Sequence, residues 1–351
     1  MDPIMPATKR PRSRRSGQSI TIQSVADHAG VSPMTVSHVL NGTKSVREST
    51  KAAVLQSVEV LGYVPNAAAR SLASARSPRI GIVYRNAQNA FLSAMLVGAL
   101  NAAARAGAQI IIRKCDDLAA ASAVEAVGAL VRSGATAILL APPYNEMLSG
   151  NPAIAALGVP MAALACGRAL EDMDVVGIDE RAAACDMTLH LLDRGYRRVG
   201  FVMGAATHSA SKARFEGYGA ALAQRGLALD PALVAPGDFT FESGLSAGAA
   251  LLDLPQPPDA IFASNDDMAA GVILAAHRRG LRIPQDVAIA GFDDAPIAVK
   301  IWPPLTTIRQ HVDVMAAQAT DWLVERHRDS DAALPPRAHW HGYELVMRES
   351  T

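Results

Sequence analysis

The polar side chains of one short segment, PMTVSHVLN, are the first whose types could do chemistry. At helical spacing Val36, Val39 and Leu40 share one face and should pack inward. Ser37 and His38 then fall on the outer face, and both can hydrogen-bond the edges of DNA bases. The spacing therefore predicts a short helix that reads a nucleic acid.

The other outer side chains of this segment suit the same task. Pro33 and Met34 share the outer face, and a methionine can contact a thymine methyl group. Thr35 lies toward the side, where a hydroxyl can reach a phosphate. The alternative is an ordinary pair of helices with a solvated face, and the pattern alone leaves it open.

Local signals define the elements that must position these residues. Thr21 can cap a first helix that Gly30 ends. Ser32 and Pro33 form a strong start for a second, because the fixed φ of proline suits the first helical position. A third is predicted from about 48 to 61. Two short helices joined by a tight turn with glycine form the helix-turn-helix arrangement.

Charge is unevenly distributed along a chain whose formal net charge is zero. Residues 1–77 hold ten Lys and Arg against four Asp and Glu, whereas the remaining residues hold 23 against 29. A small basic piece on a larger acidic body is typical of a nucleic-acid-binding head. A solvated basic tail is the alternative, since half of those cations lie in residues 1–19, where we expect disorder.

After Pro78 the sequence pattern changes to short apolar runs that alternate with Ala- and Leu-rich helical segments. Runs without polar alternation indicate parallel sheets covered on both faces, and two successive sets indicate two Rossmann-like subdomains. Ligands in such folds bind beyond the carboxyl ends of the strands. The predicted strands are RIGIVY, GAQIIIRK, ATAILLAP, VPMAALAC and DVVGID in the first set, and RRVGFVMG, DAIFASN and VAIAGFDD in the second.

Several classes of protein find no support. The 351 residues contain no apolar run of about 20 residues and no export signal, so we expect a cytoplasmic protein without contact to a membrane. Cys115, Cys166 and Cys185 are widely separated, which fits a reducing compartment and argues against a metal site. The sequence has no GxxxxGK[ST], HExxH or GxSxG motif, so we expect no enzyme and no cofactor.

A family resemblance covers roughly residues 20–348. TIQSVADHAGVSPMTVSHVLNGTKSVREST and LGYVPNAAARSLAS resemble the head and hinge of the LacI/GalR family of bacterial transcription regulators. GDFTFESG, ASNDDMAAG, GLRIPQDVAIAGFDD and PPLTTIRQ resemble its effector-binding core. The resemblance implies a repressor whose affinity for operator DNA depends on a small effector.

In the head, the resemblance implies a role for each matching position. Pro33, Met34, Ser37 and His38 would face bases in the major groove. A hinge helix would order on DNA and place an apolar wedge in the minor groove. The implied phosphate contacts are Thr21, Thr35, Asn41 and Thr50, and the implied minor-groove contacts are Asn66, Ala69 and Leu72.

In the core, the resemblance implies that Arg214, Asn265 and Asp293 hydrogen-bond the effector and that Phe239 stacks on it. These residues suit a hydroxyl-rich ligand such as a sugar. The same comparison places Phe91 after the first strand as an apolar contact.

Two further features bear on the effector. Arg85 lies near Phe91 and, together with Lys114, would suit an acidic effector such as a sugar acid or phosphate. The chain departs from many sugar-responsive members of the family at Ala165, Cys166 and Gly167. The effector of a relative is therefore not assigned to this chain.

We therefore predict a homodimer that binds a pseudo-palindromic operator. It would have an all-α helix-turn-helix head and a periplasmic-binding-protein-like α/β core. The rival classes are a periplasmic-type sugar-binding protein and a sugar-modifying α/β enzyme. The expected divisions are a tail (1–19), the head (20–65), a hinge (66–77), a first core subdomain (78–178 and 309–336) and a second (179–308 and 337–351).

Overall fold

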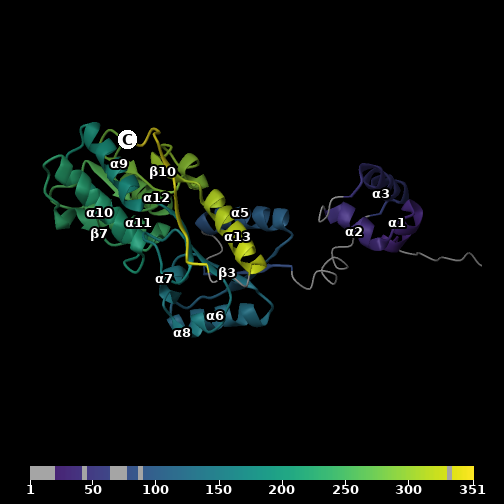
Figure 1. Cartoon of the computed structure of the whole chain (residues 1–351). Coiled ribbons are helices and arrows are strands. Elements are labelled where there is room, and N and C mark those ends of the chain that lie inside the picture. The colour runs from purple at the N-terminus through teal and green to yellow at the C-terminus, as the bar shows by residue number, and fades with distance from the viewer. Residues whose placement is uncertain (1–19, 42–45, 64–76, 86–89, 330–333) are drawn as a thin grey trace, which may run out of the picture. The chain divides into compact units, whose positions relative to one another are not determined.

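The computed structural model describes residues 20–41, 46–63, 77–85, 90–329 and 334–351. The chain divides into two compact units, Met1–Arg76 and Ser77–Thr351 (Figure 1). The predictions for the tail 1–19 and for Asn66, Ala69 and Leu72 of the hinge lie outside the described residues.

Three helices form the first unit, which we call the head: α1 (Ile22–Ala29), α2 (Pro33–Asn41) and α3 (Glu48–Leu61). Thr21 caps α1 by accepting a hydrogen bond from the Ser24 amide at 3.3 Å, and Gly30 ends it at φ 65°. The Thr35 amide donates to Ser32 Oγ at 3.1 Å and so fixes the start of α2. These signals confirm the predicted helices. The fully buried hydrophobic residues here are Val25, Ala26, Val36 and Val54.

The second unit, the core, begins with a parallel sheet in the order β11-β5-β4-β3-β1-β2. Its strands are β1 (Arg79–Tyr84), β2 (Gln109–Lys114), β3 (Ala137–Leu140), β4 (Met161–Leu164), β5 (Asp174–Ile178) and β11 (Ala338–His341). The helices of this first subdomain are α5 (Ala90–Ala106), α6 (Ala120–Arg132), α7 (Tyr144–Leu148), α8 (Pro152–Ala155) and α13 (Val312–Arg328).

A second parallel sheet has the order β7-β6-β8-β9. Its strands are β6 (Val199–Val202), β7 (Val234–Ala235), β8 (Ala260–Ala263) and β9 (Ala288–Ala290). The helices of this second subdomain are α9 (Glu180–Asp193), α10 (Ser209–Gln224), α11 (Phe241–Leu252), α12 (Asp266–Arg278) and the short 3-10 turns Pro231–Leu233 and Pro296–Val299. The predicted fold class is confirmed.

The chain passes between the subdomains after β5, after β10 (Thr307–Gln310) and after β11, and β10 pairs antiparallel with β12 (Tyr343–Val346). One expected boundary needs correction, because residues 337–351 do not all belong to the second subdomain. β11 pairs in parallel with β5 of the first sheet. Its sequence AHWH is largely exposed and has no apolar run, so its sheet partner could not be deduced locally.

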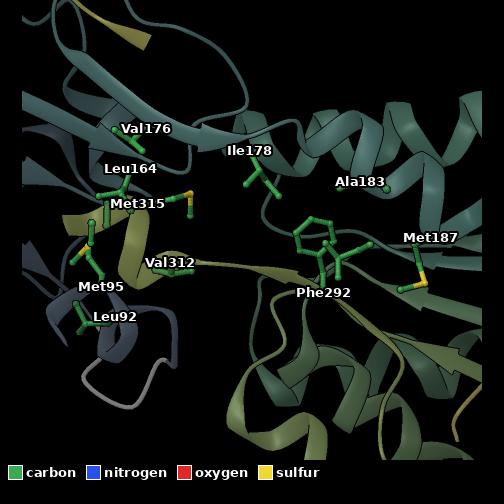
Figure 2. Close-up of a cluster of buried hydrophobic side chains, with 14 of the residues drawn as sticks. Leu92, Met95, Leu164, Val176, Ile178, Ala183, Met187, Phe292, Val312 and Met315 are labelled. Atoms are coloured by element: carbon green, nitrogen blue, oxygen red, sulfur yellow. The ribbon is translucent and has the colours of Figure 1, made fainter. Parts of the chain in front are cut away.

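One hydrophobic cluster continues from the first sheet into the second (Figure 2). Val312 and Met315 of α13 pack with the first sheet, while Phe292 lies near Ile178 at the passage between subdomains. All four side chains are at most 5% exposed. The polar site below is therefore built on a closely packed support. None of the helices in the described part of the chain is long and apolar enough to span a bilayer.

Candidate functional site

The outer face of α2 presents the side chains that the sequence assigned to base contact. Met34 is 66% exposed, while Val36 on the opposite face is fully buried. Ser37, His38 and Pro33 are partly exposed. The helix therefore packs by one face and offers the other to a partner.

The expected phosphate contacts flank this face. Thr21 is exposed and already caps α1, and the Thr35 hydroxyl lies 2.9 Å from Ser32 Oγ. Thr50 is half-buried in the first turn of α3. Asn41 closes α2, and its side chain is outside the described part.

Arg214 is the centre of the polar site in the core. It is 4% exposed, and its Nε donates to Glu180 Oε2 at 2.7 Å while Nη1 donates to the Ser264 carbonyl. The guanidinium carbon lies 3.6 Å from the ring centre of Phe292. Although burial opposes the charged form, the carboxylates of Glu180 and Asp293 raise the pKa of Arg214. Arg214 is thus a cation held in place through its Nε and Nη1 atoms.

Asp293 follows β9 in a backbone conformation, φ 117°, that residues other than glycine rarely adopt. Its Oδ1 accepts a hydrogen bond from Gln310 Nε2 at 2.6 Å. Burial raises the pKa of Asp293 to about 7, although Arg214 and Gln310 oppose the shift. A carboxyl group in this state can donate or accept a hydrogen bond near neutral pH.

Phe239 forms an aromatic wall with His208. The two rings stack with centres 5.4 Å apart and planes 18° apart. A Cβ at Gly204 would lie 2.1 Å from the Phe239 ring, so only glycine leaves room for it. Asn265 Nδ2 donates to the Phe239 carbonyl at 3.1 Å, and Asn265 Oδ1 caps α12 at 2.9 Å from the Met268 amide. The expected contact Asn265 therefore also positions the ring.

His208 is uncharged at neutral pH. Burial lowers the pKa of His208 to about 4, and the positive charge of Arg214 adds to the effect. The wall therefore consists of two neutral rings.

Phe91 and Asp293 line the same cavity, of about 220 Å³, together with Gln310. It is smaller than the roughly 300–1,000 Å³ of ordinary ligand pockets. Arg214, Phe239, Asn265 and Asp293 lie near one another but do not all line this cavity, which Phe91 and Asp293 share. They follow strands of parallel sheets, where such folds bind ligands.

The two cations that suggested an acidic effector are differently placed. Arg85 is exposed at the end of β1. Lys114 is paired with Asp116 at 2.8 Å, and both side chains are more than half exposed. Neither forms part of the buried polar cluster.

Contacts across the subdomains surround Ser209, at the start of α10. Its amide donates to the Glu146 carboxylate at 3.1 and 3.2 Å, and its hydroxyl donates to Glu146 Oε1. The Gly167 amide donates to Ser209 Oγ at 2.8 Å. A Cβ at Gly167 would lie 2.8 Å from the Ser209 carbonyl, so the departure noted at this position permits a close approach.

Asp294 connects the site to β10 and to the segment after β12, which lie near the points where the chain crosses between the subdomains. It accepts hydrogen bonds from Arg309 Nε at 2.7 Å and from Arg348 Nη2 at 2.5 Å. Arg309 also pairs with Glu344 of β12 at 2.8 Å. Asp293 is the preceding residue, so the expected effector contact is adjacent in sequence to these ion pairs.

Sequence reasoning missed Glu180, Gln310 and Glu146. The signal for Glu180 was its position just after the strand DVVGI, where ligand-binding residues of parallel sheets lie. Gln310 ends the motif PPLTTIRQ but was not singled out within it. Glu146 had no comparable signal, because its partner Ser209 is distant in sequence. Among the described residues, no group of three or more His, Cys, Asp or Glu side chains could hold a metal ion.

The chain is similar to known proteins in sequence and in structure. The family model for bacterial regulatory proteins, lacI family, matches residues 21–66, and the model for a periplasmic binding protein-like domain matches residues 188–351. Catabolite control protein A of Priestia megaterium is 33% identical over 95% of this chain and 99% of its own. The ribose operon repressor of Escherichia coli K12 is 31% identical over 87% of this chain and 92% of its own.

Solved structures agree. The transcriptional regulator CelR in complex with cellobiose has a TM-score of 0.70 and 29% identity, covering 95% of this chain and all of that one. The Lac repressor dimer bound to operator and an anti-inducer has a TM-score of 0.74 at 24% identity, covering 95% and 99% of the two chains, and supports the fold.

Proposed function

The chain belongs to the LacI family of bacterial regulatory proteins, and on that premise we propose that it binds a pseudo-palindromic operator as a homodimer under the control of a sugar-like effector. It is a DNA-binding transcription regulator and not an enzyme, because members of this family are regulators without catalytic activity. A twofold dimer imposes twofold symmetry on its site.

The observation that carries the proposal is the exposed face of α2. Met34, Ser37 and His38 lie outside the small head core, at positions that suit base edges in the major groove. Pro33 completes this face. Thr21, Thr35, Asn41 and Thr50 would hold the phosphates, and Asn66, Ala69 and Leu72 would contact the minor groove.

The effector site that we propose consists of Phe91, Arg214, Phe239, Asn265 and Asp293, with Arg85 at its margin. The effector would bind between the subdomains and change the contacts of Asp293 and Asp294 with the passages. An effector that changes the affinity of the protein for its operator must itself bind the DNA-bound and the DNA-free protein with different affinities. The two changes in affinity are the same factor.

The test is a titration of the full chain against labelled DNA from upstream of its own gene, at low and moderate salt. We expect tight binding to this DNA and at least about a 1,000-fold preference over unrelated DNA. Binding that is equal for both DNAs, or absent at both salt concentrations, would contradict the proposal.

The dimer has its own test. We expect sedimentation to give twice the chain mass, and an operator cut to one half-site to bind far more weakly. A monomer in solution that binds the full operator and the half-site equally well would exclude the dimer.

A further inference from the structure

One ring nitrogen at the edge of the first sheet is buried without a partner. Like Glu180 Oε1 and Gln310 Oε1 of the core site, His341 Nε2 forms no hydrogen bond with the described residues. The three residues that precede it in the edge strand β11 are exposed. A buried polar atom without a partner destabilises the arrangement that contains it. An arrangement that opens this ring to water would therefore relieve that cost.

Two further histidines lie close to His341. The ring of His339, on the same strand, has its centre 4.6 Å from the centre of the His341 ring. His311, which precedes α13, has Nε2 3.4 Å from Glu344 Oε1 of β12. The Glu344 carboxylate also pairs with Arg309 of β10 at 2.8 Å. The one acid of this group is thus shared by an arginine and a histidine, and it does not compensate a charge on His341.

The strand that pairs with β11 offers no free acid either. His341 is in register with Ile178 of β5, and Asp179 follows Ile178. Asp179 caps α9, while Asp186 of that helix accepts a hydrogen bond from the Tyr343 hydroxyl at 2.6 Å. Both carboxylates are already engaged, so a proton on His341 would add a positive charge without a partner.

The cluster of His311, His339 and His341 lies where the chain crosses between the subdomains. His311 directly follows β10 and is the N-cap of α13, and His341 ends β11 just before β12 begins. Hinge motions are absorbed by a few residues at the ends of elements. A change in the relative orientation of the two subdomains would therefore change the distances among these three rings.

Protonation favours one direction of this change. Burial lowers the pKa of His341 below its ordinary value of 6.5, and the neighbouring His339 and His311 lower it further. The ring therefore binds a proton less readily in this arrangement than in one where it meets water. By linkage, the present arrangement is favoured above pH 6.5 and loses this advantage as the pH falls.

We propose that His311, His339 and His341 form a proton-sensitive hinge, in which acid drives the His341 ring into water, changes the orientation of the subdomains and so alters the affinity for the operator. This inference rests on the proposed function, because it needs an operator whose binding depends on that orientation. It adds a control that requires no effector.

The experiment is operator titration of the full chain without effector, at about pH 7.5 and about pH 5.5, for the wild type and His341→Asn. Asparagine keeps a polar side chain that does not titrate. Both proteins carry the same head, so proton binding there affects both equally. We expect the affinity of the wild type to change at least about threefold more between the two pH values than that of the variant. Equal pH dependence in the two proteins would overturn the proposal.

Two further variants locate the effect. His339→Asn, at an exposed position, removes the ring next to His341 and should reduce the pH dependence. It also decides the question if His341→Asn does not fold, because a pH dependence equal to that of the wild type would contradict the cluster. His277→Asn, at an exposed ring in the last turn of α12, is the matched control and should behave as the wild type.

Hydrogen exchange reads the hinge without DNA. After correction for the intrinsic effect of pH, we expect exchange in residues 338–346 of the wild type to be at least about threefold faster at about pH 5.5 than in His341→Asn. Equal exchange would overturn the hinge. Absence of selective operator binding at both pH values would contradict the proposed function, whereas selective binding with equal pH dependence in both proteins would contradict only the hinge.

Discussion

The head and the core differ in where they keep the side chains that bind. In the head, Met34 is 66% exposed, and the described residues there include only four fully buried hydrophobic ones. In the core, Arg214 is 4% and Asn265 is 7% exposed, and both are tied into the packing. Binding in the head can therefore change at little cost to stability, whereas binding in the core is coupled to the fold.

The largest effect that would test this coupling is expected from Arg214→Met. It leaves Glu180 as an unpaired buried charge, and we expect a loss of about 3–5 kcal/mol in the free energy of unfolding. All three tryptophans lie in the core, so their fluorescence in urea measures this unfolding. Arg225→Met removes an exposed pair with Asp193 and should cost less than about 1 kcal/mol. Equal losses in both variants would refute the coupling.

The head should respond separately to a packing change. Val36→Ala removes fully buried apolar volume from a small core, and we expect a loss of about 2 kcal/mol in head stability. Operator binding should weaken strongly. The core, followed by tryptophan fluorescence, should unfold at the same urea concentration as in the wild type. Leu55→Ala, at a side chain 48% exposed, is the control. A shift of core unfolding in Val36→Ala would show that the two regions are not independent.

Acid should reveal the same coupling in the core through His208. Its pKa is about 4 in the folded chain against 6.5 unfolded, so the unfolded chain binds the proton more readily between these values. His208 thus favours the fold above pH 6.5, and this contribution is lost as pH falls toward 4. Since the ring is partly exposed, we expect wild type to lose about 1.5 kcal/mol relative to His208→Asn over this range. Parallel stability curves for the two proteins would exclude the effect.

The smallest effect is expected at the exposed face of the head. His38→Ala removes about one hydrogen bond to a base, so we expect roughly a fivefold loss in affinity for the preferred operator, or about 1 kcal/mol. Unfolding of the core, followed by tryptophan fluorescence, should not change. Competition among operators with single base changes measures the preference, and a uniform loss on every sequence would show that His38 does not contact a base.

The head was predictable because its signals are local. Thr21, Gly30 and the Ser32-Pro33 pair each fix one helix end without help from distant residues. The hydrophobic pattern also located most strands, since a run such as RIGIVY is apolar after its first residue and needs no information from distant residues. β11 was not predictable in the same way, because its position at the edge of the first sheet depends on β5.

The core site divides along the same line. The family resemblance indicated Arg214, Phe239 and Asp293, and these lie together in the structure. Glu180 follows a strand and Gln310 ends the motif PPLTTIRQ, but neither was singled out from the sequence, because an unpartnered oxygen is a property of the folded neighbourhood. A sequence indicates which residues can bind, and the packing around them determines what they still lack.

The order of elements in the first subdomain has a consequence for synthesis. α13 supplies Met315, Ala319 and Leu323 to its core, yet it follows every strand of the second sheet in the chain. At ordinary translation speeds, β3, β4 and β5 therefore wait on the order of ten seconds for the helix that covers them. The second subdomain can fold during this interval, while the first exposes apolar surface to chaperones. A ribosome that stops before Val312 would release a chain whose earliest-made subdomain lacks α13, the helix that covers its sheet.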